Sequence, residues 1–392
     1  MKTGGIPGNY TRSALILARR SSIWLGLNPR GEVVVRKKCS RKQLLHFTAN
    51  LKVRLIGMEA CGWSHFLGRA LREQGHEVRL IPAEYVKPYV KTNKSDCIDA
   101  EAIAEAVGRP TMRFVPIKTD DQLDLQSLHR VRERWVMRRT AVINQIRGLL
   151  LERGSLCARD GAMSMRRCRD TEDADATLSG ALRVLLAQLK LELDHLEMRI
   201  DEADTVIKRT AGENEACQRP ITIPGIGPVT ATAVIAAIGN GAAFRKGREF
   251  AASLGVVPGE HTIGVSKKLL GISKRGNSYL RRLFVHGARA VLQQSAKQSS
   301  GFNAWLAQLT ARTHRNLAAV ALANKLARFA WAVLARNEVY PAIGAGSYCC
   351  SLTGPQMRLR VLNFPARSAS AQRFITCHWP SAMFVLRSSP SN

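Results

Sequence analysis

"VRLIGMEACGWSHFLGRALREQGHEVRLI", residues 53–81, decides the fold, because it alternates strand and helix signals within one short stretch. Its first apolar run ends at Glu59, an amphipathic helical pattern follows and is closed by Gly75, and a second β-rich run comes after it. Further strand and helix signals flank this stretch on both sides. The pattern predicts a modest α/β domain over residues 31–118.

Two aspartates lie three positions apart at the start of the next helical pattern, "SDCIDAEAIAEA". Ser95 is a natural N-cap and the alanines that follow favour a helix, so Asp96 and Asp99 share one helix face. Together with Glu59 at a strand end, they would supply the carboxylate oxygens that Mg²⁺ prefers. The alternative is that the aspartates only complement the helix dipole and that Glu59 is an isolated surface acid.

The chain is strongly basic, since its 392 residues carry 59 Lys and Arg against 30 Asp and Glu, a formal net charge of +29. Such an excess predicts a polyanionic partner, most often nucleic acid, against the alternative of a merely basic solvated surface. The nine cysteines show no metal-binding spacing. The apolar runs are too short for a signal peptide or a membrane span, which predicts a protein of the reducing cytoplasm without a membrane partner.

Two basic stretches are candidates for phosphate contact. Residues 128–148 read as a helix with six arginines and one glutamate, and residues 262–292 contain seven Lys and Arg and no acid. We favour contact with a nucleic-acid backbone over solvated basic helices. The candidate cations are Arg138, Arg139, Lys274, Arg275, Arg281 and Arg282.

A heptad pattern lies between these stretches, and a loop-like segment at residues 155–177 precedes it. Its apolar positions alternate in spacing between four and three residues: Leu182, Leu186, Leu189, Leu193, Leu196, Ile200, Ala203 and Ile207. The pattern predicts a coiled coil, formed either as an intramolecular hairpin on the helix at residues 121–153 or between subunits.

A Gly-rich turn, "ITIPGIGPVTATAVIAAIG", separates two helical patterns. It resembles the turn of a helix-hairpin-helix, in which Gly225 and Gly227 would let backbone amides approach a phosphate oxygen at a helix N-terminus. The alternative is a tight interhelical turn that is packed in a core.

Four motifs, "GMEACG", "YVKTNKSDCIDAEAIAEA", "TIPGIGPVTATAVIAAIG" and "LLGISKRGNSYLRRLFVHGARA", closely resemble the DEDD-type bacterial insertion-sequence transposases, family 110 with its eleven-eleven subgroup. The resemblance spans about residues 31–337. It implies an α/β RNase H-like N-terminal domain, a helical coiled-coil middle, and a mainly α C-terminal domain with the helix-hairpin-helix-like motif. It further implies Mg²⁺-dependent DNA recombination by strand exchange in an oligomer, guided by an RNA from the element, in the bacterial cytoplasm at the nucleoid.

In that family four carboxylates hold magnesium, in the order Asp, Glu, Asp, Asp. The resemblance therefore implies that Glu59, Asp96 and Asp99 are catalytic metal ligands. The first aspartate is expected about fifteen residues before Gly31. It has no counterpart here, because no acid precedes Glu32.

The family's C-terminal serine is not matched either. Thr262 lies in the region where the serine is expected, and a threonine hydroxyl is a sterically poorer nucleophile. Ser266 and Ser273 lie nearby but do not match the serine position. Altered reading frames near both ends and in the middle of the chain would account for these departures.

The sequence thus predicts a transposase by descent, with the hypothesis that this copy is inactive. The alternatives are a catalytically dead nucleic-acid-binding protein that co-assembles with intact copies, and an RNase H-like structure-specific nuclease. The expected segments are an atypical N-terminus at 1–30, the RNase H-like domain at 31–118, the basic helix and coiled coil at 119–212, the C-terminal transposase domain at 213–337 and a disordered tail at 338–392.

Overall fold

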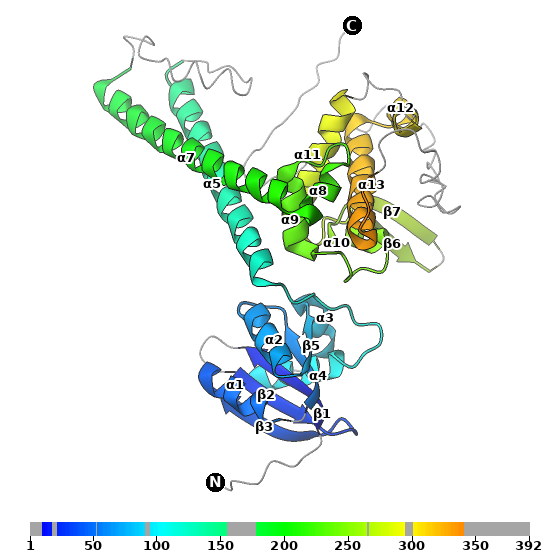
Figure 1. Ribbon diagram of the computed structural model, residues 1–392. Coiled ribbons are helices and arrows are strands. Elements are labelled where there is room, and N and C mark those ends of the chain that lie inside the picture. Colours follow the sequence, from blue (N-terminus) through cyan, green and yellow to red (C-terminus); the bar gives the residue numbers. More distant parts are fainter. Residues whose placement is uncertain are drawn as a thin grey trace. The chain divides into compact units, whose positions relative to one another are not determined.

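A five-stranded sheet organises the N-terminal part of the protein in the computed structural model (Figure 1). Its strands run in the order β3-β2-β1-β4-β5; β1, β2 and β3 pair antiparallel, whereas β4 is parallel to both β1 and β5. This mixed sheet fits the predicted RNase H-like fold. The strands are β1 (Tyr10–Leu17), β2 (Ser22–Leu27), β3 (Val33–Cys39), β4 (Val53–Glu59) and β5 (Glu77–Ile81).

The structure describes residues 10–17, 22–51, 53–90, 95–154, 178–264, 266–294 and 301–340. The predicted loop at 155–177 and nearly all of the predicted tail lie outside these residues. Two strands of the sheet, β1 and β2, come from the segment before residue 31, where the sequence interpretation placed no part of the domain.

Helices cover both faces of this sheet. On one face α1 (Arg41–Ala49) and α2 (Ser64–Glu73) enclose a core around Leu15, Trp24 and Met58. On the other face α4 (Asp96–Ala106) packs against β1 and β2 in a second core that contains Ala14. The short α3 (Ala83–Val86) and the 3₁₀-helix η1 (Lys87–Tyr89) precede α4. Because successive residues of a strand face opposite ways, Ala14 and Leu15 divide between the two cores.

Two long helices, α5 (Asp120–Leu151) and α7 (Gly180–Glu213), pack against each other within the chain (Figure 1). The heptad residues Leu193 and Leu196 cluster with Val142, and Leu182 clusters with Leu150, so the two helices run antiparallel. The apolar seam is therefore buried intramolecularly, which is one of the two arrangements expected from the sequence. Coiled-coil geometry itself stays a prediction.

The C-terminal part is mainly helical, as predicted. Its helices are α8 (Glu215–Ile221), α9 (Pro228–Ile238), α10 (Gly247–Ser253), α11 (Ser278–Gln294), α12 (Gly301–Arg312) and α13 (Arg315–Arg336). The sequence interpretation missed a β-hairpin, in which β6 (Pro258–Ile263) pairs antiparallel with β7 (Ser266–Ile272). The hairpin turns at Gly264, whose φ of +56° favours glycine.

Helix α13 corrects the expectation that every apolar run is short. Within the described residues it is the one helix that is long and apolar enough to cross a membrane, with a mean hydropathy of 1.5. However, 61% of that window is buried inside the protein, as in the core helix of a globular domain.

Candidate functional site

Three acids that the sequence singled out lie at the ends of two elements. Glu59 is the last residue of β4 and is half-buried. Burial, and to a smaller extent the charge of Glu59, raises the pKa of the Cys61 thiol. Asp96 begins α4 and is exposed, whereas Asp99, one turn further along, is half-buried.

A glycine lets α4 approach the strand that carries Glu59. An ideal Cβ on Gly57 would lie 2.8 Å from Cβ of Val107, at the C-cap of α4, so a larger residue would push the helix away. Glu59 is two positions beyond Gly57, and strand alternation therefore places it on the sheet face that α4 covers. The three acids thus belong to elements of one sheet face.

These acids do not make a metal centre as they stand. Throughout the described ranges, no group of three or more His, Cys, Asp and Glu side chains is arranged to hold a metal ion. The described residues of the neighbouring strand β1 include no carboxylate: Leu15 is level with Met58, and the residue that follows Leu15 is an isoleucine. Among the described residues the donor set is therefore incomplete for Mg²⁺, and metal binding by Glu59 and the two aspartates stays a prediction.

The hydroxyl groups of the C-terminal region lie on or beside the β6–β7 hairpin. Thr262 is exposed on β6 and its Oγ1 donates to Glu260 Oε1 at 2.9 Å. Ser266 lies at the start of β7, opposite Ile263, and Ser273 follows the end of β7. The Glu260 carboxylate is a group that can accept the proton of the Thr262 hydroxyl, and Thr262 as nucleophile stays a prediction.

Several predicted phosphate-binding cations have partners within the chain. Arg138 pairs with Glu192 of α7, Nε to Oε1, at 2.7 Å, and Arg282 pairs with Glu133 of α5. Arg281 Nη1 donates to the carbonyl oxygens of Leu254 at 2.8 Å and of Arg275 at 3.1 Å, which caps α10. These contacts explain the three arginines structurally.

The remaining candidate cations differ in their surroundings. Lys274 and Arg275 are exposed in the loop before α11, where Lys274 adopts a left-handed φ of 54°. Arg139 is half-buried, and its Nε has no hydrogen-bond partner among the described residues. Lys274 and Arg275 are therefore the candidates best placed for a phosphate backbone.

The turn between α8 and α9 has a packing role. Gly225 has a φ of +86°, and its backbone lies against Gly287 of α11, where an ideal Cβ on Gly287 would be 2.0 Å from the Gly225 carbonyl oxygen. This contact explains Gly225 by close approach of two backbones. Gly227 is the N-cap of α9 and has open space around it. Phosphate contact at this turn stays a prediction.

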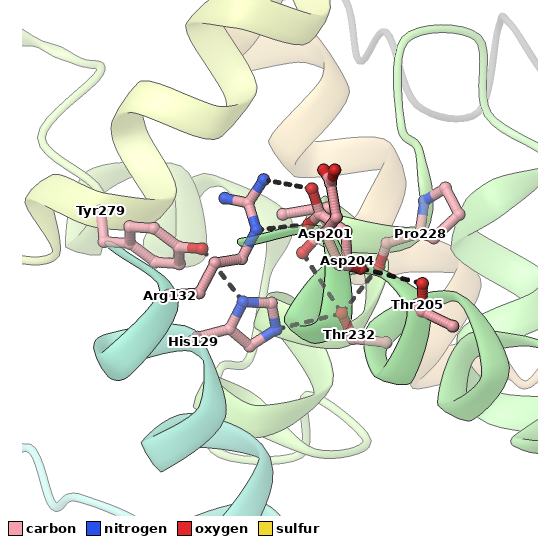
Figure 2. Close-up of polar contacts among 9 residues, drawn as sticks. His129, Arg132, Asp201, Asp204, Thr205, Pro228, Thr232 and Tyr279 are labelled. Carbon is pink, nitrogen blue, oxygen red and sulfur yellow. Dashed lines mark hydrogen bonds and ion pairs between the residues drawn. The ribbon is translucent and has the colours of Figure 1, made fainter. Parts of the chain in front are cut away.

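A buried polar network that the sequence did not reveal joins α5, α7, α9 and α11 (Figure 2). His129 Nδ1 lies 3.0 Å from the hydroxyl of Tyr279, and Nε2 lies 3.0 Å from Oγ1 of Thr232. Arg132 binds the carboxylate of Asp204 through Nε and Nη2, the latter at 3.0 Å, and also hydrogen-bonds Tyr279. Through Tyr279, these contacts hold α11, the helix that follows the loop of Lys274 and Arg275, against its neighbours.

The geometry assigns a protonation state to this network. Thr232 donates its hydroxyl proton to the Pro228 carbonyl at 2.7 Å, so its oxygen accepts from Nε2–H of His129. The other nitrogen, Nδ1, then accepts from Tyr279. Burial, aided by the charge of Arg132 and opposed by Asp204, lowers the pKa of His129 from 6.5 to about 4.

An aromatic pair that follows Glu59 in the sequence, Trp63 and Phe66, is also unexpected from sequence. Trp63, the N-cap of α2, has a left-handed φ of 75°, a strained conformation for so bulky a residue. Its ring stacks on Phe66 with centroids 5.9 Å apart, and Phe66 is 48% exposed. A Trp at a left-handed position has no sequence signal that would have predicted it.

Two family models match the chain. The model described as "Transposase IS116/IS110/IS902 family" matches residues 217–303, and a DEDD-type transposase model matches residues 25–153. The first covers the α8–α9 turn and the basic loop, and the second covers the sheet from β2 onward and α4.

Similar proteins cover most of the chain. A probable family 20 transposase of Pseudomonas aeruginosa is 44% identical over 334 residues, which is 85% of this chain and 99% of that relative. The transposase for insertion sequence element IS1328 of Yersinia enterocolitica is 40% identical over 79% of this chain and 92% of its own length. The transposase for IS1111A of Coxiella burnetii is 41% identical over 80% of this chain and 87% of its own length.

Proposed function

Because the chain belongs to the IS110 family of insertion-sequence transposases, we propose that it binds the DNA of its element while its strand-cleavage step is impaired. One observation carries this proposal: Leu15 of β1 is level with Met58 of β4, and the next residue of β1, at the position that would continue this register to Glu59, is an isoleucine. Cleavage of a phosphodiester by clustered carboxylates needs metal ions between acids from adjacent elements, and one of these positions is apolar here.

The basic surface supports the binding half of this proposal. The net charge of +29 favours a polyanion, and the exposed Lys274 and Arg275 precede α11. We further propose that the α8–α9 turn acts in the manner of a helix-hairpin-helix through Gly227. A guide RNA, which the family resemblance implies, would compete for the same cationic surface.

The binding half predicts a loss of affinity when the basic loop is neutralised. For the double variant Lys274→Gln/Arg275→Gln we expect about tenfold weaker binding to the element's end DNA at about 0.1 M salt. The slope of log K against log salt should become shallower by about 2, since two phosphate contacts are lost. Mobility-shift titrations at several salt concentrations measure both quantities.

A matched control is present on α7, where Lys208 and Arg209 are also adjacent and exposed. The variant Lys208→Gln/Arg209→Gln should leave the slope unchanged. Equal losses in both variants would mean that net charge alone governs binding and that the loop has no specific part. If the unaltered chain cleaved the same DNA in the presence of Mg²⁺, the proposal that its strand-cleavage step is impaired would be wrong.

We also propose that the chain assembles with a second copy through the outer face of α7. Val184, Leu191 and Met198 are spaced seven residues apart and are 59%, 62% and 52% exposed. At 100° per residue they lie opposite the seam that packs on α5. One face of α7 already packs on α5. A second repeating apolar stripe on its opposite face is therefore suited to pack against the same stripe of another copy.

Sedimentation velocity tests this assembly. The variant Leu191→Glu should shift the chain toward the monomer, because a carboxylate at the centre of the stripe would be buried without a partner. Leu317→Glu is the matched control, since Leu317 is 64% exposed on α13, outside the stripe. A monomeric unaltered chain, or equal effects of both variants, would contradict the proposed interface.

A further inference from the structure

The register of the sheet identifies the position at which the acid set is incomplete. In β1 and β4 the residue pairs Ala14–Gly57 and Leu15–Met58 are level, so position 16 is level with Glu59 at the carboxyl ends of two parallel strands. Position 16 is two residues beyond Ala14, and Ala14 belongs to the core under α4. It is therefore a position of the same sheet face as Glu59 and the helix that begins with Asp96.

The first two strands fit the interior of the sheet poorly. Among the residues that the structure describes, four buried side-chain nitrogen and oxygen atoms have no hydrogen-bond partner, and three of these belong to β1 and β2. They are Ser13 Oγ, Ser22 Oγ and Trp24 Nε1, on residues that are all 0% exposed. Native interiors satisfy nearly all such groups, so their concentration in one hairpin indicates a segment that was not selected for this core.

The boundary of this misfit coincides with a boundary in the sequence. The DEDD-type family model begins to match at residue 25, within β2, although β1 and the start of β2 belong to the same sheet. No acid occurs before Glu32. Strands β1 and β2 are therefore part of the sheet, while Ser13, Ser22 and Trp24 bring polar atoms without partners into its interior.

The genetic code supplies a single cause. Every isoleucine codon begins with A-T, and leucine codons can end in G. A shift of the frame by one nucleotide, from Leu15 into Ile16, then reads G-A-T, a codon for aspartate. We infer that the residues before Leu25 are read one nucleotide out of frame, and that position 16 is the vacated place of a fourth carboxylate.

This inference rests on the proposed function for the meaning of the fourth acid, but its first test does not involve DNA binding. In the nucleotide sequence that encodes residues 16–25, the frame shifted by one nucleotide should contain no stop codon and should encode aspartate at position 16. A stop codon in that stretch, or a residue other than Asp at position 16, would overturn the inference even if the chain binds DNA.

The second test restores the acid in the protein. The variant Ile16→Asp should bind Mn²⁺ at least about tenfold more tightly than the unaltered chain in isothermal titration calorimetry, since even outer ligands of metal sites contribute about 10–100-fold. Ile16→Asn is the control for polarity without charge and should not gain this affinity. Equal Mn²⁺ binding by Ile16→Asp and Ile16→Asn would overturn the assignment of position 16. An Ile16→Asp chain that loses its circular-dichroism signal of folding would also count against an acid there.

Discussion

Replacing Gly287 by alanine should lower the free energy of unfolding of the C-terminal region by about 3 kcal/mol. The new Cβ would lie 2.0 Å from the carbonyl oxygen of Gly225, which is far inside van der Waals contact. Neither partner can yield by rotating a side chain, because the collision involves backbone on both sides. Helix α11 and the α8–α9 turn must therefore separate, and chemical denaturation followed by circular dichroism measures the loss.

The control for this variant is Gly148→Ala. Gly148 lies inside α5, and an ideal Cβ there meets nothing within 4 Å. Alanine should stabilise this helix by about 0.5–1 kcal/mol, because glycine loses more backbone entropy on folding. If Gly287→Ala were as stable as the unaltered chain, the close backbone contact that explains Gly225 would be wrong, and the turn would again be open to a purely phosphate-binding interpretation.

Acidification should destabilise the protein through His129. Its pKa is lowered from 6.5 to about 4 in the folded state, so the unfolded chain binds the proton more readily. The stability that this histidine contributes is complete above pH 6.5 and is lost as the pH falls from 6.5 toward 4. A difference of about 2.5 pKa units corresponds to about 3 kcal/mol. A proton on Nδ1 would face the Tyr279 hydroxyl beside the charge of Arg132, with only Asp204 to offset it.

The variant His129→Gln isolates this contribution, since glutamine can donate and accept hydrogen bonds but does not titrate. Its unfolding free energy should fall less between pH 6.5 and pH 4 than that of the unaltered chain, by about 3 kcal/mol. His195→Gln serves as the control, because His195 is exposed on α7 and should leave the acid loss as it is. Identical pH profiles for the unaltered chain and His129→Gln would show that the histidine is not buried in its neutral form.

The parts of the fold that were predictable from sequence are those with a local period. The strand that ends at Glu59, helix α2 and the heptad seam of α7 follow from alternation or from spacings of three and four residues. The β6–β7 hairpin was missed because its residues are nearly all exposed, and an exposed ribbon shows no alternation of apolar and polar positions. Strand β1 was missed because pairing with β4, across about forty residues, rather than its own pattern, defines it.

The residues of the candidate site also divide into those that a local sequence pattern reveals and those that only the packing of distant elements brings together. The spacing of Asp96 and Asp99 was readable because one helical turn brings them together. The network of His129 and Tyr279 was not readable, since its members are 150 positions apart and meet only when α5 and α11 pack. The internal roles of Arg281 and Arg282 were likewise hidden, because their partners, the Leu254 carbonyl and Glu133, lie on other elements.

The most direct test of the central claim compares strand cleavage by the unaltered chain and by Ile16→Asp. Both would be given the element's end DNA, its RNA and Mg²⁺, and cleaved strands would be resolved on a denaturing gel. We expect DNA binding by both chains, with cleaved strands only from Ile16→Asp. Equal cleavage by the two chains, abolished in the unaltered chain by Glu59→Gln, would show that the acids already present suffice and would contradict the account.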